Sequence, residues 1–574
     1  MCRLVRVTLL DSPQVDASTR PEPLVEQPAR RTTIAMAMAL IAIYGLLNLL
    51  ANPGAHLLTD VGGKAASLEA MSQRGDWNVD MGYWFEDADP TGQFYPLDKT
   101  TLTPNGKWVN TTSLTMIYPM RPLYAVGGAR LAALIPMLGG LLCALAAAAL
   151  ERRIDTTSTG RWSFWLVGLA SPVVVYALDL WEHSLGLGMT AVAVVAVHDA
   201  LHDRMPLRVS ALAGLMYGLG ATMRQEALVY GFVAGLVLVA VSASRRNVRT
   251  SVSRGLAMAA AMIVPLALHT IVEYIVLGGP IRFQRTASTA SSGGSGTSSD
   301  QLGSALTSTV NLLNGTNPIQ TVLGMLFGAG VVWFTLDMMA GRRPRYSRLL
   351  LIGLFAIALV VYLSDLTPVP SLIVAAPLTI VGTVAAVRTR TWIPLALGLA
   401  PLPFVLLSQF PGGDSFQWGA RYALLTGLVL TVTAVGLLRR EHKQLLTVFT
   451  AASIVISLYG AGWAITRINN SAEDRASIAT LTDPDDVVVW RSPIVAREFG
   501  SMAIGRRWLS AELPDDQLEL ARVFERQNID SFVWIDDFTN PVTHFPGYEI
   551  IETLGELSNF GHNVRVLRRI DIDE

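Results

Sequence analysis

The sequence predicts a polytopic α-helical membrane protein that ends in a small α/β domain, and three observations carry this prediction. Of the 574 residues, 51% are hydrophobic and only 16% are charged. The hydrophobic residues gather in long runs, and a helix of about 20 such residues can cross a bilayer. The connections between the runs alternate in arginine content, as loops on opposite sides of a membrane do. These features exclude a soluble globular protein.

Thirteen apolar windows are candidates for membrane-spanning helices. They lie near residues 33–51, 131–150, 162–180, 184–201, 208–223, 226–243, 255–277, 319–339, 348–364, 369–387, 392–410, 421–438 and 444–465. We therefore expect about 13 transmembrane helices. Residues 1–32 would form a tail before the first of them, and residues 33–465 the transmembrane domain.

Every second connection is rich in basic residues, and this pattern predicts the orientation. The basic set comprises Arg152, Arg153 and Arg161; Arg204 and Arg208; Arg245, Arg246, Arg249 and Arg254; Arg342, Arg343, Arg345 and Arg348; Arg388 and Arg390; and Arg439, Arg440 and Lys443. By the positive-inside rule these connections and the N-terminus are cytoplasmic, and an odd number of spans leaves the C-terminus outside. Because only 4 of the 44 basic residues are lysines, which is typical of a GC-rich bacterial genome, we expect a bacterial plasma membrane.

Two long connections lie on the predicted outer side. Residues 52–130 form a first outer loop rich in acids and aromatic residues. Residues 279–318 form a second, whose core from Ala287 to Ser299 consists of Ser, Gly, Thr and Ala. Such a core buries too little apolar area to order itself, so we expect a mobile loop that acts either as a lid or as an idle linker.

Residues 466–574 are predicted to form an extracytoplasmic soluble domain. Residues 486–490 and 531–535 have the apolar pattern of buried strands, and residues 515–527 that of an amphipathic helix between them. Residues 548–552 and 564–567 favour further strands. Strands that alternate with helices predict a compact α/β layer, with a structural or acceptor-docking role.

Polar residues gather at the predicted outer ends of the spans. The candidates for a binding site are Asp60 and Lys64 at the start of the first loop; Asp80, Tyr118 and Arg121 further along it; Glu182 and His183; Arg224 and Glu226; and Asp414, Trp418 and Arg421. Any one of them is more often a solvated helix end or a structural ion pair. Ionisable groups at membrane depth are costly and usually face a cavity or a partner, so their placement at one level indicates a site.

Transfer from a lipid-linked donor fits these residue types. A polyprenyl-phosphate sugar would present its phosphate at the interface and its tail among the helices. The reaction needs a carboxylate that takes a proton from the acceptor hydroxyl, and Asp60 suits that role. It also needs cations for the phosphate leaving group, and the planar forks of Arg224 and Arg421 suit that one.

Several short motifs resemble the GT-C superfamily of polyprenyl-phosphate-sugar-dependent glycosyltransferases. They are Thr59-Asp60-Val61-Gly62 after the first span, the stretch from Tyr118 to Tyr124, the run from Gly218 to Ala227, and the segment from Gly412 to Tyr422. The resemblance is greatest to the bacterial protein-mannosyltransferase-like and lipid A aminoarabinose-transferase-like members. It covers the whole chain in architecture and includes a soluble domain at the outer C-terminus.

The resemblance implies a GT-C-like fold and an inverting, single-displacement transfer with Asp60 as general base. The donor would be a polyprenyl-phosphate sugar, and the acceptor a cell-envelope glycan, lipid or protein. The family has an Asp-Glu pair after the first span, whereas this chain has Val61 at the second position. Asp76, Asp80 or Glu86 are the candidates for the missing acid. No cofactor is implied with certainty, and a divalent cation held by Asp60 and another loop acid remains open.

The main alternative is a transporter or flippase of lipid-linked sugars, which would share the helices and the interfacial arginines. Transporters of that kind are expected to have internal repeats and polar sites near the middle of the membrane. The sequence has no such repeat, and its charged groups gather at one face, which favours the enzyme. A non-catalytic scaffold would leave the acids of the first loop unexplained.

Overall fold

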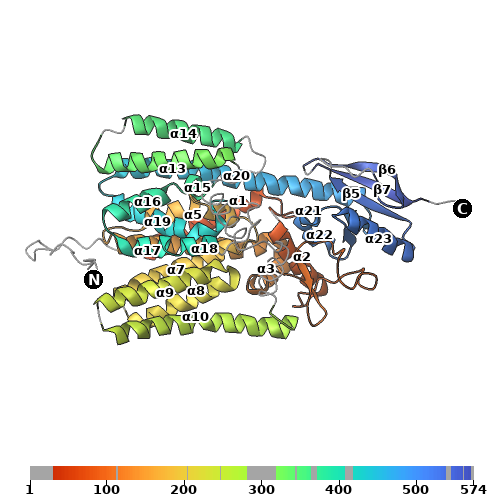
Figure 1. Ribbon diagram of the computed structural model, residues 1–574, viewed down its shortest axis with the longest axis horizontal. Helices are drawn as coiled ribbons and strands as arrows, with labels where there is room; N and C mark the ends of the chain where they lie inside the picture. Colours follow the sequence, from red (N-terminus) through yellow and green to blue (C-terminus); the bar gives the residue numbers. More distant parts are fainter. Residues whose placement is uncertain are drawn as a thin grey trace, which may run out of the picture.

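A helical bundle and a sheet-containing lobe make up the protein, as seen in a computed structural model (Figure 1). The structure describes residues 30–57, 59–111, 114–202, 205–245, 247–280, 318–342, 345–363, 371–407, 418–537, 544–559 and 561–570. Most of the predicted tail 1–32, most of the loop 279–318 and the candidate Asp414 therefore lie outside the described residues. The long helix α20 (Lys443–Leu481) runs from the bundle into the other lobe.

The described part of the bundle contains eight helices that are long and apolar enough to cross a membrane. Seven of them are α1 (Arg30–Leu50), α4 (Leu134–Ile154), α7 (His183–Leu201), α9 (Glu226–Arg245), α10 (Val248–Leu277), α13 (Pro318–Met339) and α20. The eighth consists of the short helix η1 (Arg421–Ala423) followed by α19 (Leu424–Leu438). Two other helices, α8 (Pro206–Met223) and α14 (Arg345–Leu363), match further predicted spans in position. The protein is therefore a polytopic helical membrane protein, and the number thirteen remains a prediction.

Three predicted spans are interrupted, each at a proline. The window 162–180 contains α5 (Arg161–Leu169) and α6 (Val173–Tyr176), and Pro172 stands directly before α6. The window 369–387 contains α15 (Leu372–Ala375) and α16 (Leu378–Arg388), with Pro377 between them. In the third window Pro401 separates α17 (Trp392–Leu399) from α18 (Leu402–Leu407). Proline lacks the backbone N–H that a continuing helix needs, which a count of apolar residues does not register.

Much of the predicted first outer loop is helical. Residues Thr59–Arg74 form α2, and Leu114–Ala132 form α3, which is kinked at Gly127 and Gly128. Between them lies a small antiparallel hairpin of β1 (Thr100–Leu102) and β2 (Trp108–Asn110). Helix α2 was not expected because its mean hydropathy is low, yet Ala65, Ala66 and Leu68 are fully buried.

The C-terminal lobe is built on a five-stranded sheet with the strand order β4-β3-β5-β7-β6. Its strands are β3 (Val487–Trp490), β4 (Arg507–Ser510), β5 (Ser531–Asp537), β6 (Tyr548–Leu557) and β7 (His562–Arg569). Strand β3 is parallel to both β4 and β5, whereas β7 is antiparallel to β5 and β6. The four predicted strands and the amphipathic helix, α23 (Pro514–Arg526), are confirmed, and β4 was missed.

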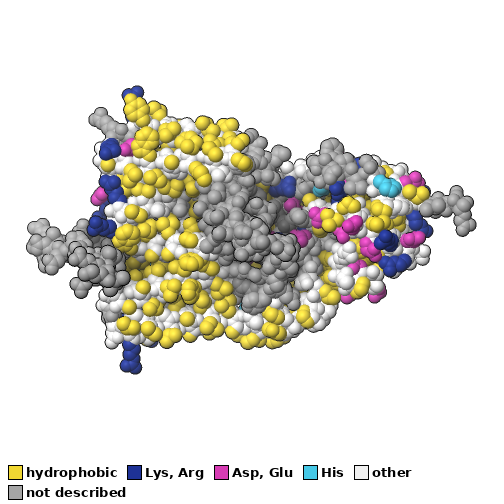
Figure 2. Space-filling model, viewed as in Figure 1, with side chains coloured by type: hydrophobic (Ala, Val, Ile, Leu, Met, Phe, Trp, Pro, Cys, Tyr) yellow, Lys and Arg dark blue, Asp and Glu magenta, His cyan; other side chains and the backbone are white. Residues whose placement is uncertain are grey.

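Helix α2 lies between the bundle and the C-terminal lobe and positions the site. It packs against α3 on one side and against the short helices α21 (Pro493–Glu498) and α22 (Gly500–Ala503) on the other (Figure 1). Figure 2 shows that the bundle surface is largely hydrophobic, with Lys and Arg gathered at the end away from the sheet, while the lobe carries charges of both signs. The junction of the two lobes is therefore at one end of the apolar surface.

Candidate functional site

Asp60 lies in the first turn of α2, where the helix dipole favours a carboxylate. Its side chain is largely buried, and three cations approach it from three segments of the chain. Oδ1 lies 3.3 Å from Lys99 Nζ and 3.4 Å from Arg497 Nη1, and Oδ2 lies 3.8 Å from Arg421 Nη1. A buried carboxylate is tolerated when it is paired in this way, because the cations replace its lost hydration.

Lys64, one helical turn after Asp60, links α2 to the start of α7. Its ammonium group is 2.6 Å from Glu182 Oε2, donates to the backbone oxygen of Asp60 at 3.3 Å, and lies 5.6 Å from the centre of the Trp181 ring. Burial acts to raise the pKa of Glu182, but the charge of Lys64, with that of Arg224, outweighs it and lowers that pKa. Glu182 is therefore a permanent anion in the site.

Arg224 and Arg421 lie against the same aromatic ring. Arg224 donates from Nε to Glu226 Oε1 at 2.9 Å and from Nη1 to Glu182 Oε1 at 3.3 Å. Its guanidinium carbon is 5.1 Å from the centre of the Tyr422 ring, and that of Arg421 is 4.8 Å from it. Arg421 also donates to the Tyr422 hydroxyl at 2.8 Å. The π electrons of Tyr422 thus offset the repulsion between two neighbouring cations.

His183 is a buried histidine at the wall of a cavity. It stacks on Tyr176, with 4.8 Å between ring centres and 15° between ring planes. Neither ring nitrogen has a hydrogen-bond partner among the described residues. Buried polar atoms are rarely left in that state, so these nitrogens are available to a ligand.

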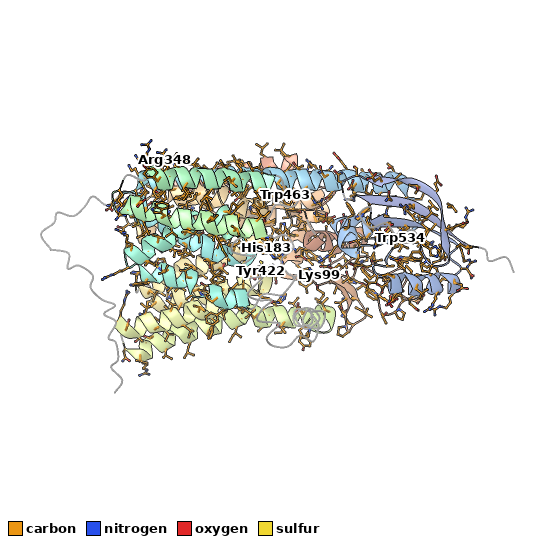
Figure 3. The ribbon with its side chains drawn as sticks, turned by 45° about the horizontal axis from the view of Figure 1, so that its top comes forward. Lys99, His183, Arg348, Tyr422, Trp463 and Trp534 are labelled. Carbon is orange, nitrogen blue, oxygen red and sulfur yellow. The ribbon has the colours of Figure 1, made fainter. Side chains whose placement is uncertain are left out.

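The cavity has a volume of about 320 Å³, open space at its mouth included. Polar side chains form one part of its lining and apolar ones the other. The lining residues are His183, Gly186, Leu187, Thr190, Arg224, Glu226, Ala227, Tyr230, Arg421, Tyr422, Leu424 and Leu425. Figure 3 shows His183, Tyr422 and Lys99 near the junction of the lobes, whereas Arg348 lies at the opposite end of the bundle. The lining therefore places cationic side chains beside apolar ones, the combination that recognises an anionic head group on an apolar chain.

The structure brings together Asp60, Lys64, Glu182, His183, Arg224, Glu226 and Arg421 of the sequence-predicted set. The others have different surroundings. Asp80 accepts hydrogen bonds from the backbone N–H groups of Gly82 and Trp108, which fixes a turn. Arg121 donates to the backbone oxygens of Asp76 and Met71, and Tyr118 lies against Trp77. Trp418 is buried beside Trp463 and accepts a hydrogen bond from Tyr176 at its backbone oxygen.

Three residues of the site were missed from the sequence: Lys99, Tyr422 and Arg497. Tyr422 is the immediate neighbour of Arg421, and that adjacency was the available signal. The backbone of Lys99 has a positive φ of 56°, a conformation that the sequence alone does not predict. Arg497 comes from the C-terminal lobe, far along the chain from Asp60, and no local pattern indicates their contact.

A metal site was left open by the sequence. Among the described residues, no group of three or more His, Cys, Asp or Glu side chains could hold a metal ion. The neighbours of Asp60 given above are cations, and one of them, Arg497, also contacts Asp98, at 3.6 Å.

No family model and no curated protein matches this chain. Among solved structures it is similar to the oligosaccharyltransferase of Archaeoglobus fulgidus, with 12% identity, a TM-score of 0.43, and coverage of 86% of this chain and 68% of that one. It is also similar to ArnT from Cupriavidus metallidurans bound to undecaprenyl phosphate, with 13% identity, a TM-score of 0.42, and coverage of 94% and 98%.

Both of these proteins are GT-C glycosyltransferases, the superfamily that the sequence motifs resemble. ArnT is an aminoarabinose transferase, one of the two groups to which the motifs are most similar. The identities and TM-scores are too low to assign a function to this chain. The function therefore has to be inferred from the residues of its own site.

The Lys64–Glu182 pair generates a stability prediction. Glu182→Gln leaves the buried Lys64 without its carboxylate, and Lys64→Met leaves Glu182 with Arg224 as its remaining cation; breaking a buried pair costs about 3–5 kcal/mol. The double variant should lose less than the sum of the two, because neither charge is then stranded. Thermal unfolding in detergent measures this coupling. The exposed pair Arg522–Glu519, treated in the same way, should show a coupling below about 1 kcal/mol. Additive losses at Lys64 and Glu182 would contradict the pairing.

A second prediction concerns pH and Glu498, whose Oε2 is 3.3 Å from Arg467 Nη2. Burial raises the pKa of Glu498 to about 7, from an ordinary value of 4.5, and Arg467 only partly opposes this. Protonated Glu498 therefore makes its full contribution to the stability of the fold below pH 4.5, and this contribution is lost as the pH rises through about 7. We expect wild type to lose thermal stability relative to Glu498→Gln over that range. The exposed Glu519→Gln serves as control, and a pH-independent difference would refute the assignment.

Proposed function

We propose that this protein is an integral membrane glycosyltransferase of the GT-C type. It moves a sugar from a polyprenyl-phosphate donor to an acceptor on the outer face of a bacterial plasma membrane. The observation that carries the proposal is the arrangement of the site. A buried carboxylate, Asp60, contacts Arg421, and Arg421 lines a cavity that has a polar part and an apolar part.

The phosphate of the donor would bind between Arg224 and Arg421. Both guanidinium groups line the cavity, and their planar forks suit two phosphate oxygens each. The polyprenyl chain would leave the head group along Leu187, Ala227, Leu424 and Leu425, which form the apolar wall. The uncommitted ring nitrogens of His183 would contact hydroxyl groups of the sugar.

The charge of the site supports a donor with one phosphate. Within the described residues, the ion pairs of the site form two neighbouring groups, around Asp60 and around Glu182, which together contain five cations and four carboxylates. The cations are Lys64, Lys99, Arg224, Arg421 and Arg497, and the carboxylates are Asp60, Asp98, Glu182 and Glu226. One positive charge remains, which matches the single negative charge of a sugar phosphodiester. A diphosphate would leave an excess negative charge in a buried site, and that is costly.

The reaction would be a single displacement with inversion at the anomeric carbon. Asp60 takes the proton from the acceptor hydroxyl as the oxygen forms its bond to that carbon. The bond from the carbon to the phosphate oxygen breaks at the same time, and the phosphate leaves with the electron pair. Arg224 and Arg421 stabilise the negative charge that develops on the phosphate, which is the larger part of the catalytic effect.

The proposed orientation has the site outside the cell. Lys and Arg gather at the end of the bundle opposite the junction, which supports a cytoplasmic location for that end (Figure 2). The tail 1–32 would then be cytoplasmic, and residues 466–574 would form the extracytoplasmic domain. The sugar and the chemical class of the acceptor are not determined by the residues of this site.

The direct test is an assay with purified protein and radiolabelled polyprenyl-phosphate mannose, arabinose and glucose, each mixed with cell-envelope extract. Label that moves from the lipid into a product supports the enzyme. Label that crosses a vesicle membrane while it stays on the lipid supports the flippase instead.

Asp60→Asn is predicted to abolish transfer, because the amide cannot accept the proton of the acceptor hydroxyl. We expect turnover to fall by about 100-fold or more, which is the usual contribution of a general base. Binding of the lipid donor should stay close to wild type when it is measured on folded protein, since the amide also removes a carboxylate partner of Arg421 and Arg497. An Asp60→Asn variant that keeps normal turnover would exclude Asp60 as the base.

Arg224→Ala and Arg421→Ala are predicted to weaken donor binding, because each removes a cation that faces the phosphate. The loss should be about 10- to 100-fold in affinity for each, since a charge-assisted hydrogen bond contributes about 1.5–3 kcal/mol. Arg439→Ala, at the arginine-rich end of the bundle, is the control and should bind the donor normally. Normal binding by both site variants would mean that the phosphate lies elsewhere.

A further inference from the structure

At Gly62 and Gly63, the contact between α2 and the C-terminal lobe is closer than a side chain at either position would allow. A Cβ atom on Gly62 would lie 1.6 Å from the backbone oxygen of Arg497, and one on Gly63 would lie 2.8 Å from its Nε. From the other side, a Cβ on Gly500 would lie 2.3 Å from the backbone oxygen of Gly62. Three glycines therefore allow the backbones to meet, and this brings Arg497 next to the first turn of α2.

Arg497 is fully buried at this contact, although arginine is rarely buried without a reason. Its Nη1 is 3.4 Å from Asp60 Oδ1 and 3.6 Å from Asp98 Oδ2, and its Nη2 donates to Asn110 Oδ1 at 3.2 Å. The partners come from α2, from the loop before β1 and from β2. The guanidinium group thus gathers three separate segments around Asp60.

The two oxygens of Asp60 have different surroundings. Lys99 and Arg497 both contact Oδ1, from the side of the C-terminal lobe. Oδ2 faces Arg421, which lines the cavity, at the longer distance of 3.8 Å. Oδ1 therefore contacts cations on the side of the C-terminal lobe, whereas Oδ2 lies on the side of Arg421, a residue that lines the cavity.

We propose that Arg497 is a positioning residue that the C-terminal lobe contributes to the active site. Together with Lys99 it fixes Oδ1 of Asp60, so that Oδ2 is aimed at the acceptor hydroxyl beside Arg421. This inference rests on the proposed function, in which Asp60 is the base. It makes the C-terminal lobe part of the catalytic centre, since the site is incomplete until α21 has docked on α2.

The position of a base matters because proton transfer requires hydrogen-bond distance. A misplacement of about 1 Å can lower a rate by about 100-fold without changing the reacting groups. A purely structural role for Arg497 makes a different prediction. Its loss would then reduce the amount of folded protein, and each folded molecule would keep its normal turnover.

The test compares Arg497→Lys, Arg497→Gln and Gly62→Ala in the full-length protein with the donor that wild type turns over best. We expect kcat to fall by about 100-fold in Arg497→Gln and by less in Arg497→Lys, which keeps the charge but not the planar fork. Affinity for the donor should change by less than about 2-fold, because Arg497 does not line the cavity. Gly62→Ala should also lower kcat, since its Cβ displaces the Arg497 backbone while the guanidinium group remains.

Two matched variants serve as controls. Arg491→Gln breaks another ion pair of the C-terminal lobe, to Asp536 at 3.2 Å, and should leave kcat unchanged. Gly45→Ala adds a methyl group where nothing lies within 4 Å, and should also be neutral. Thermal unfolding of every variant shows that kcat is measured on folded protein.

The outcomes separate the two proposals. If wild type transfers sugar and Arg497→Gln has the same kcat, the positioning role is wrong and the proposed function stands. If Arg497→Gln does not fold, Arg497→Lys decides: a reduced kcat at unchanged donor affinity supports the role, and a normal kcat overturns it. If wild type transfers no sugar from any of the donors, the proposed function fails and this inference fails with it.

Discussion

The buried carboxylate of Asp60 is the interaction on which the rest of the site depends. A carboxylate that leaves water loses its hydration and must be compensated by cations at close range. Here Lys99, Arg421 and Arg497 provide that compensation, and they come from a loop, the bundle and the C-terminal lobe. The requirement to pair one anion thus ties together parts of the chain that are far apart in sequence.

The same requirement explains why the surrounding charges form a connected set. Placing three cations around one largely buried acid would be unfavourable without further carboxylates, and Asp98 is one of them. On the bundle side, Glu182 and Glu226 compensate Lys64 and Arg224. Among the ion pairs of the described residues the cations outnumber the carboxylates by one, and two of these cations, Arg224 and Arg421, line the partly apolar cavity. A buried excess charge favours binding of a ligand with the opposite charge.

Sequence reasoning predicted the membrane class, the positions of many of the described helices and four of the five described C-terminal strands, and it proposed Asp60 and Arg421, which the structure places 3.8 Å apart. These features depend on the spacing of hydrophobic residues, on turn residues and on the arginine content of each connection. All three can be read from short stretches of the sequence. The breaks at Pro172, Pro377 and Pro401 show the limit of counting apolar residues. These breaks could have been predicted from the rule that proline interrupts a helix.

The contact of Arg497 with Asp60 could not be predicted, because it depends on how the C-terminal lobe docks on α2. The glycines at positions 62 and 63 were visible as a pair, but in a sequence two glycines suggest a loop rather than a helix. Their role becomes clear only when the backbone oxygen of Arg497 is seen next to them. Close approach between distant segments is a tertiary property.

A structure of the protein with bound polyprenyl phosphate, determined by electron cryomicroscopy, would show whether Arg224 and Arg421 hold the donor. We expect the phosphate to contact both arginines, the chain to follow Leu187 and Leu424, and Asp60 to stay bound to Arg497. This expectation would be contradicted by a phosphate in another cavity, such as the one of about 280 Å³ lined by His56 and Arg130, with the cavity beside Tyr422 left without lipid.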